Sequence, residues 1–208
     1  MTHTKKQTAQ FDPLRDVMLA QSSKPPELGN VDLHTLTPFQ RALLVLDGTV
    51  TKFIEAYTLE PLDIVRLDQA TQVLPEDHYW LAAPKGTEVG LRQVLIRSKS
   101  SLTAYAYAVS LLVFERLPDR VRYGIEIQGE GIGRLLNDSE LETRREVLWY
   151  GQEHRQDLPD IVQRSAGSDF ISRTYRIISK GCPIALINEK FPRATDKQSL
   201  AGQGTGPD

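Results

Sequence analysis

Hydrophobic residues follow two different spacings along the chain, and the first spacing is helical. Large apolar residues recur at helical intervals in residues 38–46, and Thr37 followed by Pro38 has the pattern of an N-cap and a first helical position. This pattern predicts a helix that ends near Gly48. A second short helix is expected over residues 51–57.

The second spacing consists of alternating or continuous apolar runs of strand length. We expect strands at residues 62–69, 91–98, 103–114 and 145–151, a closing hairpin over 171–193 that turns at Lys180-Gly181, and short helices within 118–138 and 157–165. Strands that are grouped around hairpins pair antiparallel. The chain is therefore predicted to be an α+β protein with a single antiparallel sheet of about six strands and accompanying helices.

The length of 208 residues, with 40% hydrophobic residues, suits one domain with its own core. Residues 1–33 mix proline, glycine and polar residues without a sustained period, and residues 194–208 are too polar to bury much surface. We therefore expect a flexible N-terminal tail over 1–33, a domain over 34–193 and a disordered C-terminal tail over 194–208.

Two charged residues occupy strand positions where apolar residues are expected. Because side chains alternate across a strand, Glu189 shares a face with Ile187 and Phe191, and Arg92 shares a face with Val94. Burying an isolated charge is costly unless the charge is paired or serves a ligand. One explanation is structural, with a strand end that reaches water or an Arg92–Glu189 ion pair. The other is a mostly apolar pocket in which Arg92 clamps an anionic substrate and Glu189 handles a hydroxyl group or a proton.

The bulk composition narrows the class of partner. Lysine and arginine number 25 against 27 acidic residues, so the chain has no positive field for nucleic acid. The longest apolar run, near residues 105–114, is far below the roughly 20 residues needed to span a bilayer. The polar first ten residues do not form a secretory signal, and the single cysteine, Cys182, cannot form an intrachain disulfide. A cytoplasmic protein without membrane insertion is expected.

Other motifs give weaker signals. Residues 129–133 (GEGIG) resemble a phosphate-binding loop only superficially, and the four histidines are scattered without ligand spacing, so no metal site is predicted. Arg173, Arg176 and Lys180 form a basic cluster that is typical of a solvated strand face, with a secondary role in attracting an anion.

A family resemblance covers most of residues 37–192. It begins in DGTVTKFIEA (47–56), continues through VGLRQVLIRSKSSLTAYAYAVSLLVFERLP (89–118) and GIGRLLNDSELE (131–142), and ends in TYRIISKGCPIALINEKFP (174–192). These segments resemble the chorismate pyruvate-lyases, closest to the branch found in cyanobacteria and mycobacteria. The resemblance implies an enzyme that converts chorismate into 4-hydroxybenzoate and pyruvate without metal or organic cofactor, in a buried pocket that helical flaps close over a single antiparallel sheet.

The same resemblance implies roles for individual residues. Arg92 would grip the ring carboxylate, and Glu189 would meet the ring hydroxyl and assist the movement of one proton. Val50 matches the apolar residue of the first flap, and Ile132 and Gly133 match the turn of the second. Some relatives have glycine where this chain has Ala106, which puts a main-chain contact to the ligand there in doubt.

Two other functions stay open at this stage. The same fold resembles the effector-binding domain of a class of bacterial transcription regulators, so a non-catalytic binder of aromatic acids is the first. Fewer than forty residues precede the first predicted helix, without a recognition-helix pattern, so DNA binding is not expected. The second is a chorismatase that gives another hydroxybenzoate. The family implies that the product feeds quinone synthesis, with plastoquinone favoured, or the synthesis of phenolic lipids. The oligomeric state does not follow from the sequence, and a monomer is plausible.

Overall fold

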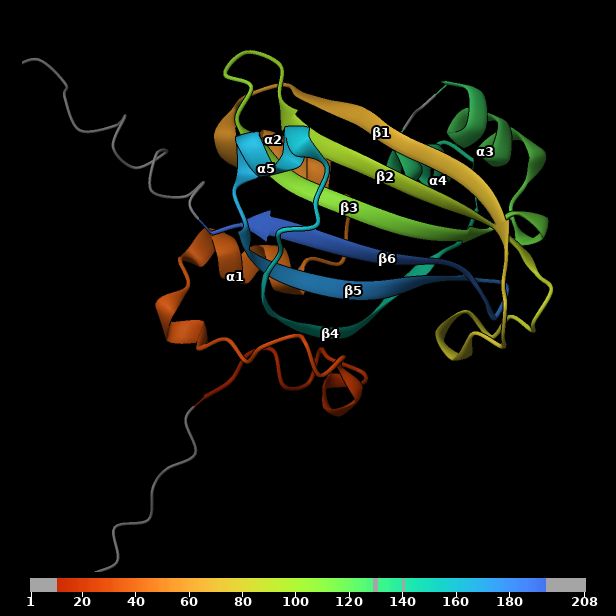
Figure 1. Ribbon diagram of the computed structural model, residues 1–208, viewed down its shortest axis with the longest axis horizontal. Coiled ribbons are helices and arrows are strands. Elements are labelled where there is room, and N and C mark those ends of the chain that lie inside the picture. The colour runs from red at the N-terminus through yellow and green to blue at the C-terminus, as the bar shows by residue number, and fades with distance from the viewer. Residues whose placement is uncertain (1–10, 129–130, 140, 194–208) are drawn as a thin grey trace, which may run out of the picture.

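Six strands form one antiparallel sheet in the computed structural model, which describes residues 11–128, 131–139 and 141–193. Across the sheet the strands follow the order β1-β2-β3-β6-β5-β4 (Figure 1). They are β1 (Leu62–Val73), β2 (Glu88–Ser98), β3 (Ala104–Val113), β4 (Arg144–His154), β5 (Asp169–Ser179) and β6 (Cys182–Pro192). The α+β prediction with an antiparallel sheet is confirmed.

Most pairs of neighbouring strands are also consecutive in the chain. The exception is the pairing of β3 with β6, which joins the two halves of the sheet. Lys180 and Gly181 both have positive φ, 49° and 78°, as a tight two-residue hairpin turn between β5 and β6 requires. The last strand, β6, does not lie at an edge, because its other side pairs with β3. Glu189 is therefore carried by a central strand, between Ala108 of β3 and Arg173 of β5.

Short helices follow or precede these strands. They are α1 (Pro38–Val45), α2 (Val50–Thr58), α3 (Asp119–Tyr123), α4 (Ile132–Asn137) and α5 (Asp160–Ala166), together with a π-helical turn at Gly124–Gln128 and 3-10 turns at Gln21–Ser23, Leu33–Thr35, Tyr79–Leu81 and Phe114–Arg116. The predicted start of α1 is confirmed: Thr37 and Gln40 form a reciprocal capping box, with Pro38 at the first helical position.

The two faces of the sheet carry different helices. Figure 1 shows α5 in front of the sheet and α2 and α4 behind it. The face with α5 buries Leu95, Tyr107 and Phe170. On the other face, α1 and α2 pack over one end of the sheet, around Ile96 and Phe191, while α3 and α4 pack over the other end. The strip of sheet between these two helical clusters is the place where a cavity can form.

Residues 11–33 differ from the flexible tail expected over 1–33, because the described part of the segment is docked on the sheet. Leu14 is 1% exposed, and the amides of Leu19 and Ala20 donate to carbonyls of β4 at 2.8 and 2.9 Å. As β4 is an edge strand, its outer backbone groups need partners, and this segment supplies them. The predicted tails at 1–10 and 194–208 lie outside the described residues. In the part of the chain that is described, no helix is long and apolar enough to cross a membrane.

Candidate functional site

A cavity with about 550 Å³ of empty volume, part of it open to solvent, lies between the two helical clusters. Its floor is the sheet, where β2, β3, β5 and β6 contribute side chains. Its cover comes from two loops that lead into helices, at residues 48–51 and 131–133. All five residues that the family resemblance marked line this one cavity: Val50, Arg92, Ile132, Gly133 and Glu189.

The two covering loops touch each other, and glycine makes that contact possible. A Cβ on Gly133 would lie 3.0 Å from the Thr49 side chain, and a Cβ on Gly131 would lie 2.6 Å from Ile64 Cδ1. Val50 begins α2 and Ile132 begins α4, so the two helices present their first turns to the cavity. A larger side chain at Gly133 would push the two loops apart, and one at Gly131 would push its loop away from β1.

Arg92 enters the cavity from β2. Its side chain lies on the same face as Val94 and Ile96, as the alternation predicted, and only 2% of the residue is exposed. Burial, together with the smaller effect of the nearby Arg66 charge, lowers the pKa of Arg92 to about 10. A desolvated guanidinium repelled by a second cation gains strongly from an anion bound beside it. This end of the cavity therefore suits a carboxylate.

Glu189 enters from β6 and is held by two neighbours on β5. Arg173 Nε donates to Glu189 Oε2 at 2.9 Å, and the Tyr175 hydroxyl donates to Oε1 at 3.1 Å. Arg173 is 1% exposed and its Nη1 also donates to the Leu46 carbonyl, so the charge of Glu189 is compensated and its orientation is fixed. Each carboxylate oxygen has two lone pairs, so Glu189 can still accept a hydrogen bond from a ligand.

The predicted basic cluster is corrected by this arrangement. Lys180 is exposed in the turn, but Arg173 is buried on the cavity side, and Arg176 lies on the opposite face, where it pairs with Glu146 at 2.7 Å. Arg176 follows Arg173 by three positions on the strand, and residues an odd number of positions apart point to opposite faces. That alternation was the signal in the sequence that could have identified Arg173 as an inward residue.

Tyr175 completes the group around Glu189. Burial raises the pKa of Tyr175 above its ordinary value, and the neighbouring Glu189 charge raises it further. The phenol therefore stays protonated and remains a hydrogen-bond donor. Sequence reasoning did not single out Tyr175, because a tyrosine in a strand is ordinary core material by pattern alone.

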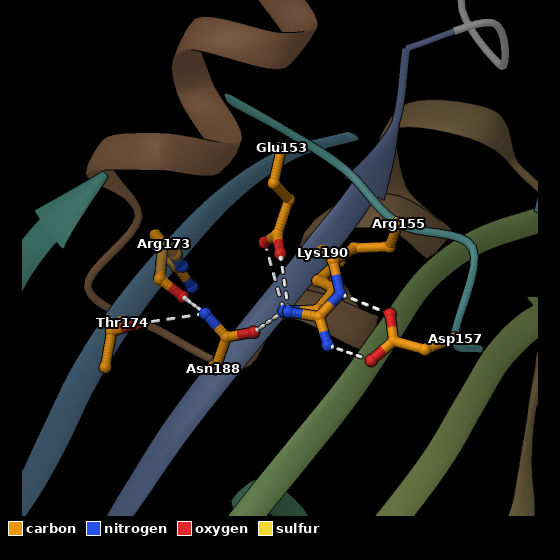
Figure 2. Close-up of polar contacts among 7 residues, drawn as sticks. All are labelled: Glu153, Arg155, Asp157, Arg173, Thr174, Asn188 and Lys190. Carbon is orange, nitrogen blue, oxygen red and sulfur yellow. Dashed lines mark hydrogen bonds and ion pairs between the residues drawn. The ribbon is translucent and has the colours of Figure 1, made fainter. Parts of the chain in front are cut away.

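The other face of β6 has a polar network that anchors the strand. Figure 2 shows Lys190 between Glu153 and Asn188, with Arg155 held by Asp157. Lys190 Nζ lies 3.0 Å from Glu153 Oε1, and burial lowers the pKa of Lys190 while Glu153 opposes that effect. Because Asn188 and Lys190 flank Glu189 in sequence, the network holds the backbone that positions Glu189.

Three remaining sequence signals do not meet at the cavity. Ala106 is fully buried and packs with the α1 and α2 cluster, and it is Ala108, two residues along β3, that lines the cavity. Cys182 is exposed at the start of β6. No group of three or more His, Cys, Asp or Glu side chains is arranged as a metal site within the described ranges, and residues 129–130 of the glycine-rich motif fall outside them.

Arg145 of β4 is a second arginine on the cavity wall, and sequence reasoning missed it. It begins the predicted strand 145–151, next to Arg144, and nothing in the local pattern separates the two. Arg144 is largely exposed, with a side chain that is 70% accessible, whereas Arg145 is partly buried.

Comparison with known proteins gives one consistent family. Residues 44–198 match the family described as Rv2949c-like chorismate pyruvate-lyase. A protein named chorismate pyruvate-lyase from Mycobacterium tuberculosis is 24% identical over 184 residues, covering 80% of this chain and 86% of that protein. One with the same name from Mycobacterium leprae is 27% identical over 183 residues, covering 80% of each.

Solved structures show the same fold at much lower identity. PhnF from Mycobacterium smegmatis superimposes with a TM-score of 0.55 at 9% identity, over 71% of this chain and 65% of that one. Its effector domain alone gives a TM-score of 0.52 at 8% identity, over 70% of this chain and 88% of that domain. At such identity the likeness concerns the fold alone.

Proposed function

The chain belongs to the Rv2949c-like chorismate pyruvate-lyase family, and on that basis we propose that it converts chorismate into 4-hydroxybenzoate and pyruvate. The observation that carries the proposal is the cavity itself, where the buried guanidinium of Arg92 and the carboxylate of Glu189 lie among largely apolar side chains of β2, β3 and β6. Such a pocket matches a ring that carries an anionic group at one end and a hydroxyl at the other.

The proposed reaction needs orientation more than reactive groups. The C4–H and C3–O bonds of chorismate break, the ring becomes aromatic, and the methylene carbon of the released side chain gains a proton to give pyruvate. Arg92 holds the ring carboxylate through its two parallel N–H groups. Glu189, oriented by Arg173 and Tyr175, accepts a hydrogen bond from the ring hydroxyl and assists removal of the C4 proton. We propose that no metal or organic cofactor takes part.

The two covering loops have a role in this scheme. With Val50, Ile132 and Gly133 over the ring, water is kept away from the reacting atoms. Release of the product then requires the contact between Thr49 and Gly133 to open. We propose that the 4-hydroxybenzoate formed serves quinone or phenolic lipid synthesis.

Product identification tests the function. Purified protein is incubated with chorismate, the products are separated chromatographically, and pyruvate is assayed in parallel against a control without protein. Equal amounts of 4-hydroxybenzoate and pyruvate are expected. Another hydroxybenzoate would make the protein a different chorismatase.

Variants then separate the role of Arg92 in binding from the role of Glu189 in turnover. Arg92→Ala should chiefly raise KM, and Glu189→Gln should chiefly lower kcat. Arg97→Ala is a matched control, because it removes an arginine from the same strand that does not line the cavity. Wild-type kinetics in both site variants would contradict the residue roles.

A second candidate function is binding without catalysis, favoured by the likeness of the fold to the PhnF effector domain. It predicts saturable binding of 4-hydroxybenzoate with no pyruvate formed from chorismate. The incubation with chorismate separates the two functions directly.

A further inference from the structure

Two guanidinium groups line the cavity among the described residues, and they come from opposite sides of it. Arg92 lies on β2 and Arg145 on β4, with β3, β6 and β5 between them. The backbones of β2 and β4 are therefore about 19 Å apart across the sheet, which is four strand spacings of about 4.8 Å. Glu189 is on the strand midway between them.

The charge of Arg145 is not compensated by any described residue. Its Nε is buried without a hydrogen-bond partner, and no described acid lies within ion-pair distance of it. The adjacent Glu146 is engaged by Arg144 and Arg176, and Glu189 is engaged by Arg173. A partly buried cation on a cavity wall is favourable when the ligand brings the opposite charge.

Building on the proposed function, we propose that Arg145 binds the carboxylate of the enolpyruvyl side chain of chorismate. Chorismate carries two carboxylates, one on the ring and one on this side chain. The side chain is attached at C3, next to the C4 hydroxyl assigned to Glu189 and remote from the ring carboxylate assigned to Arg92. It therefore extends toward the part of the cavity that Arg145 borders.

Two further observations agree with this placement. The charge of Arg145 acts on the Tyr175 hydroxyl, where it lowers the pKa of Tyr175 against the larger opposing effect of burial, so Arg145 is electrostatically close to the Glu189 group. Arg145 also borders an outer groove between residues 16–19 and β4.

Arg66 and Arg173 are the other described cations near the site, and neither lines the cavity. Arg66 is exposed on the edge strand β1, does not line the cavity, and donates to the Glu126 carbonyl at 3.1 Å. Its charge acts on Arg92, at the ring-carboxylate end. Arg145 is thus the described cation that can serve the second carboxylate.

The experiment compares a ligand that has the side chain with one that lacks it. For Arg145→Gln, KM for chorismate should rise about tenfold or more, because a charge-assisted hydrogen bond is lost. The dissociation constant of 4-hydroxybenzoate, measured by calorimetry, should stay within about twofold of wild type. Arg92→Ala should weaken both ligands. Arg144→Gln removes the neighbouring exposed arginine and should change neither.

Arg145→Lys guards against a variant that fails to fold, and it should recover part of the affinity for chorismate because it keeps the charge. Unchanged KM in Arg145→Gln, or equal weakening of chorismate and 4-hydroxybenzoate, would overturn the inference. If the wild type forms no pyruvate, the proposed function fails separately. Calorimetric titration with chorismate then decides on Arg145, and equal affinity in wild type and Arg145→Gln would refute its role.

Discussion

Replacing Arg173 with methionine should strongly destabilise the fold, because it leaves the Glu189 charge buried alone. Arg173 and Glu189 are 1% and 3% exposed, and Arg173 Nε lies 2.9 Å from Glu189 Oε2. Methionine keeps most of the apolar volume, so packing between Tyr175 and Phe191 changes little. The variant Arg173→Met therefore isolates the electrostatic effect.

The magnitude follows from the contacts that are lost. Removing one partner of a buried ion pair costs about 3–5 kcal/mol of unfolding free energy. The hydrogen bond from Arg173 Nη1 to the Leu46 carbonyl, 2.7 Å long, adds about 1 kcal/mol. The total, about 4–6 kcal/mol, is a large part of the roughly 5–15 kcal/mol that holds a typical domain together. A fall in Tm of roughly 10–20 °C is expected.

Urea unfolding of the wild type, Arg173→Met and the double variant Arg173→Met/Glu189→Met measures these energies. Replacing both charges with apolar side chains should recover most of the loss, since the buried pair itself contributes little net stability. A loss below about 1 kcal/mol, or a double variant no more stable than the single one, would refute the reasoning.

Three other predictions rest on particular contacts. Gly133→Ala would put a Cβ 3.0 Å from the Thr49 side chain, so kcat/KM for chorismate should fall about tenfold and recover when Thr49→Ala makes room; no fall would show that the two loops tolerate separation. Gly151→Ala would put a Cβ 2.4 Å from Leu28 Cγ and displace the N-terminal segment, so limited proteolysis with mass spectrometry should detect faster cleavage within residues 11–33; cleavage at the wild-type rate would contradict the docking. Burial raises the pKa of Tyr175 above that of an unfolded tyrosine, so the unfolded chain releases this proton first, and stability should fall with pH above about 10. The stability difference between wild type and Tyr175→Phe, measured by urea unfolding, should therefore shrink between about pH 9 and pH 11, whereas a constant difference would count against the raised pKa.

Local pattern was enough to predict the strands and the side of the sheet on which the two key charges lie. A strand has a period of two, so the neighbours of Arg92 and Glu189 already indicate which face each residue shares. The start of the helix after Thr37 could also be predicted from nearby residues, because its capping box involves residues three apart. These features depend on few neighbours in sequence, so no knowledge of the tertiary structure is needed.

The partner of Glu189 depended on the register of the final hairpin. Ser179 pairs with Cys182, and regular pairing from there would set Ser172 opposite Glu189. A bulge between Ile177 and Ile178 shifts the register by one residue, so Arg173 is opposite instead. A one-residue shift of this kind has no clear signal in the sequence, yet it decides which side chain compensates the buried charge.

The sequence by itself determined the α+β class, the hairpins, and the inward direction of Arg92 and Glu189, because short-range periodicity and turn chemistry encode them. Only the tertiary structure decided that β6 lies between β3 and β5, that Arg145 reaches the same cavity, and that residues 11–33 dock on the edge of β4. These are contacts between segments far apart in the chain. They form because a sheet edge and an apolar face must be covered, and the covering segment need not have any pattern of its own.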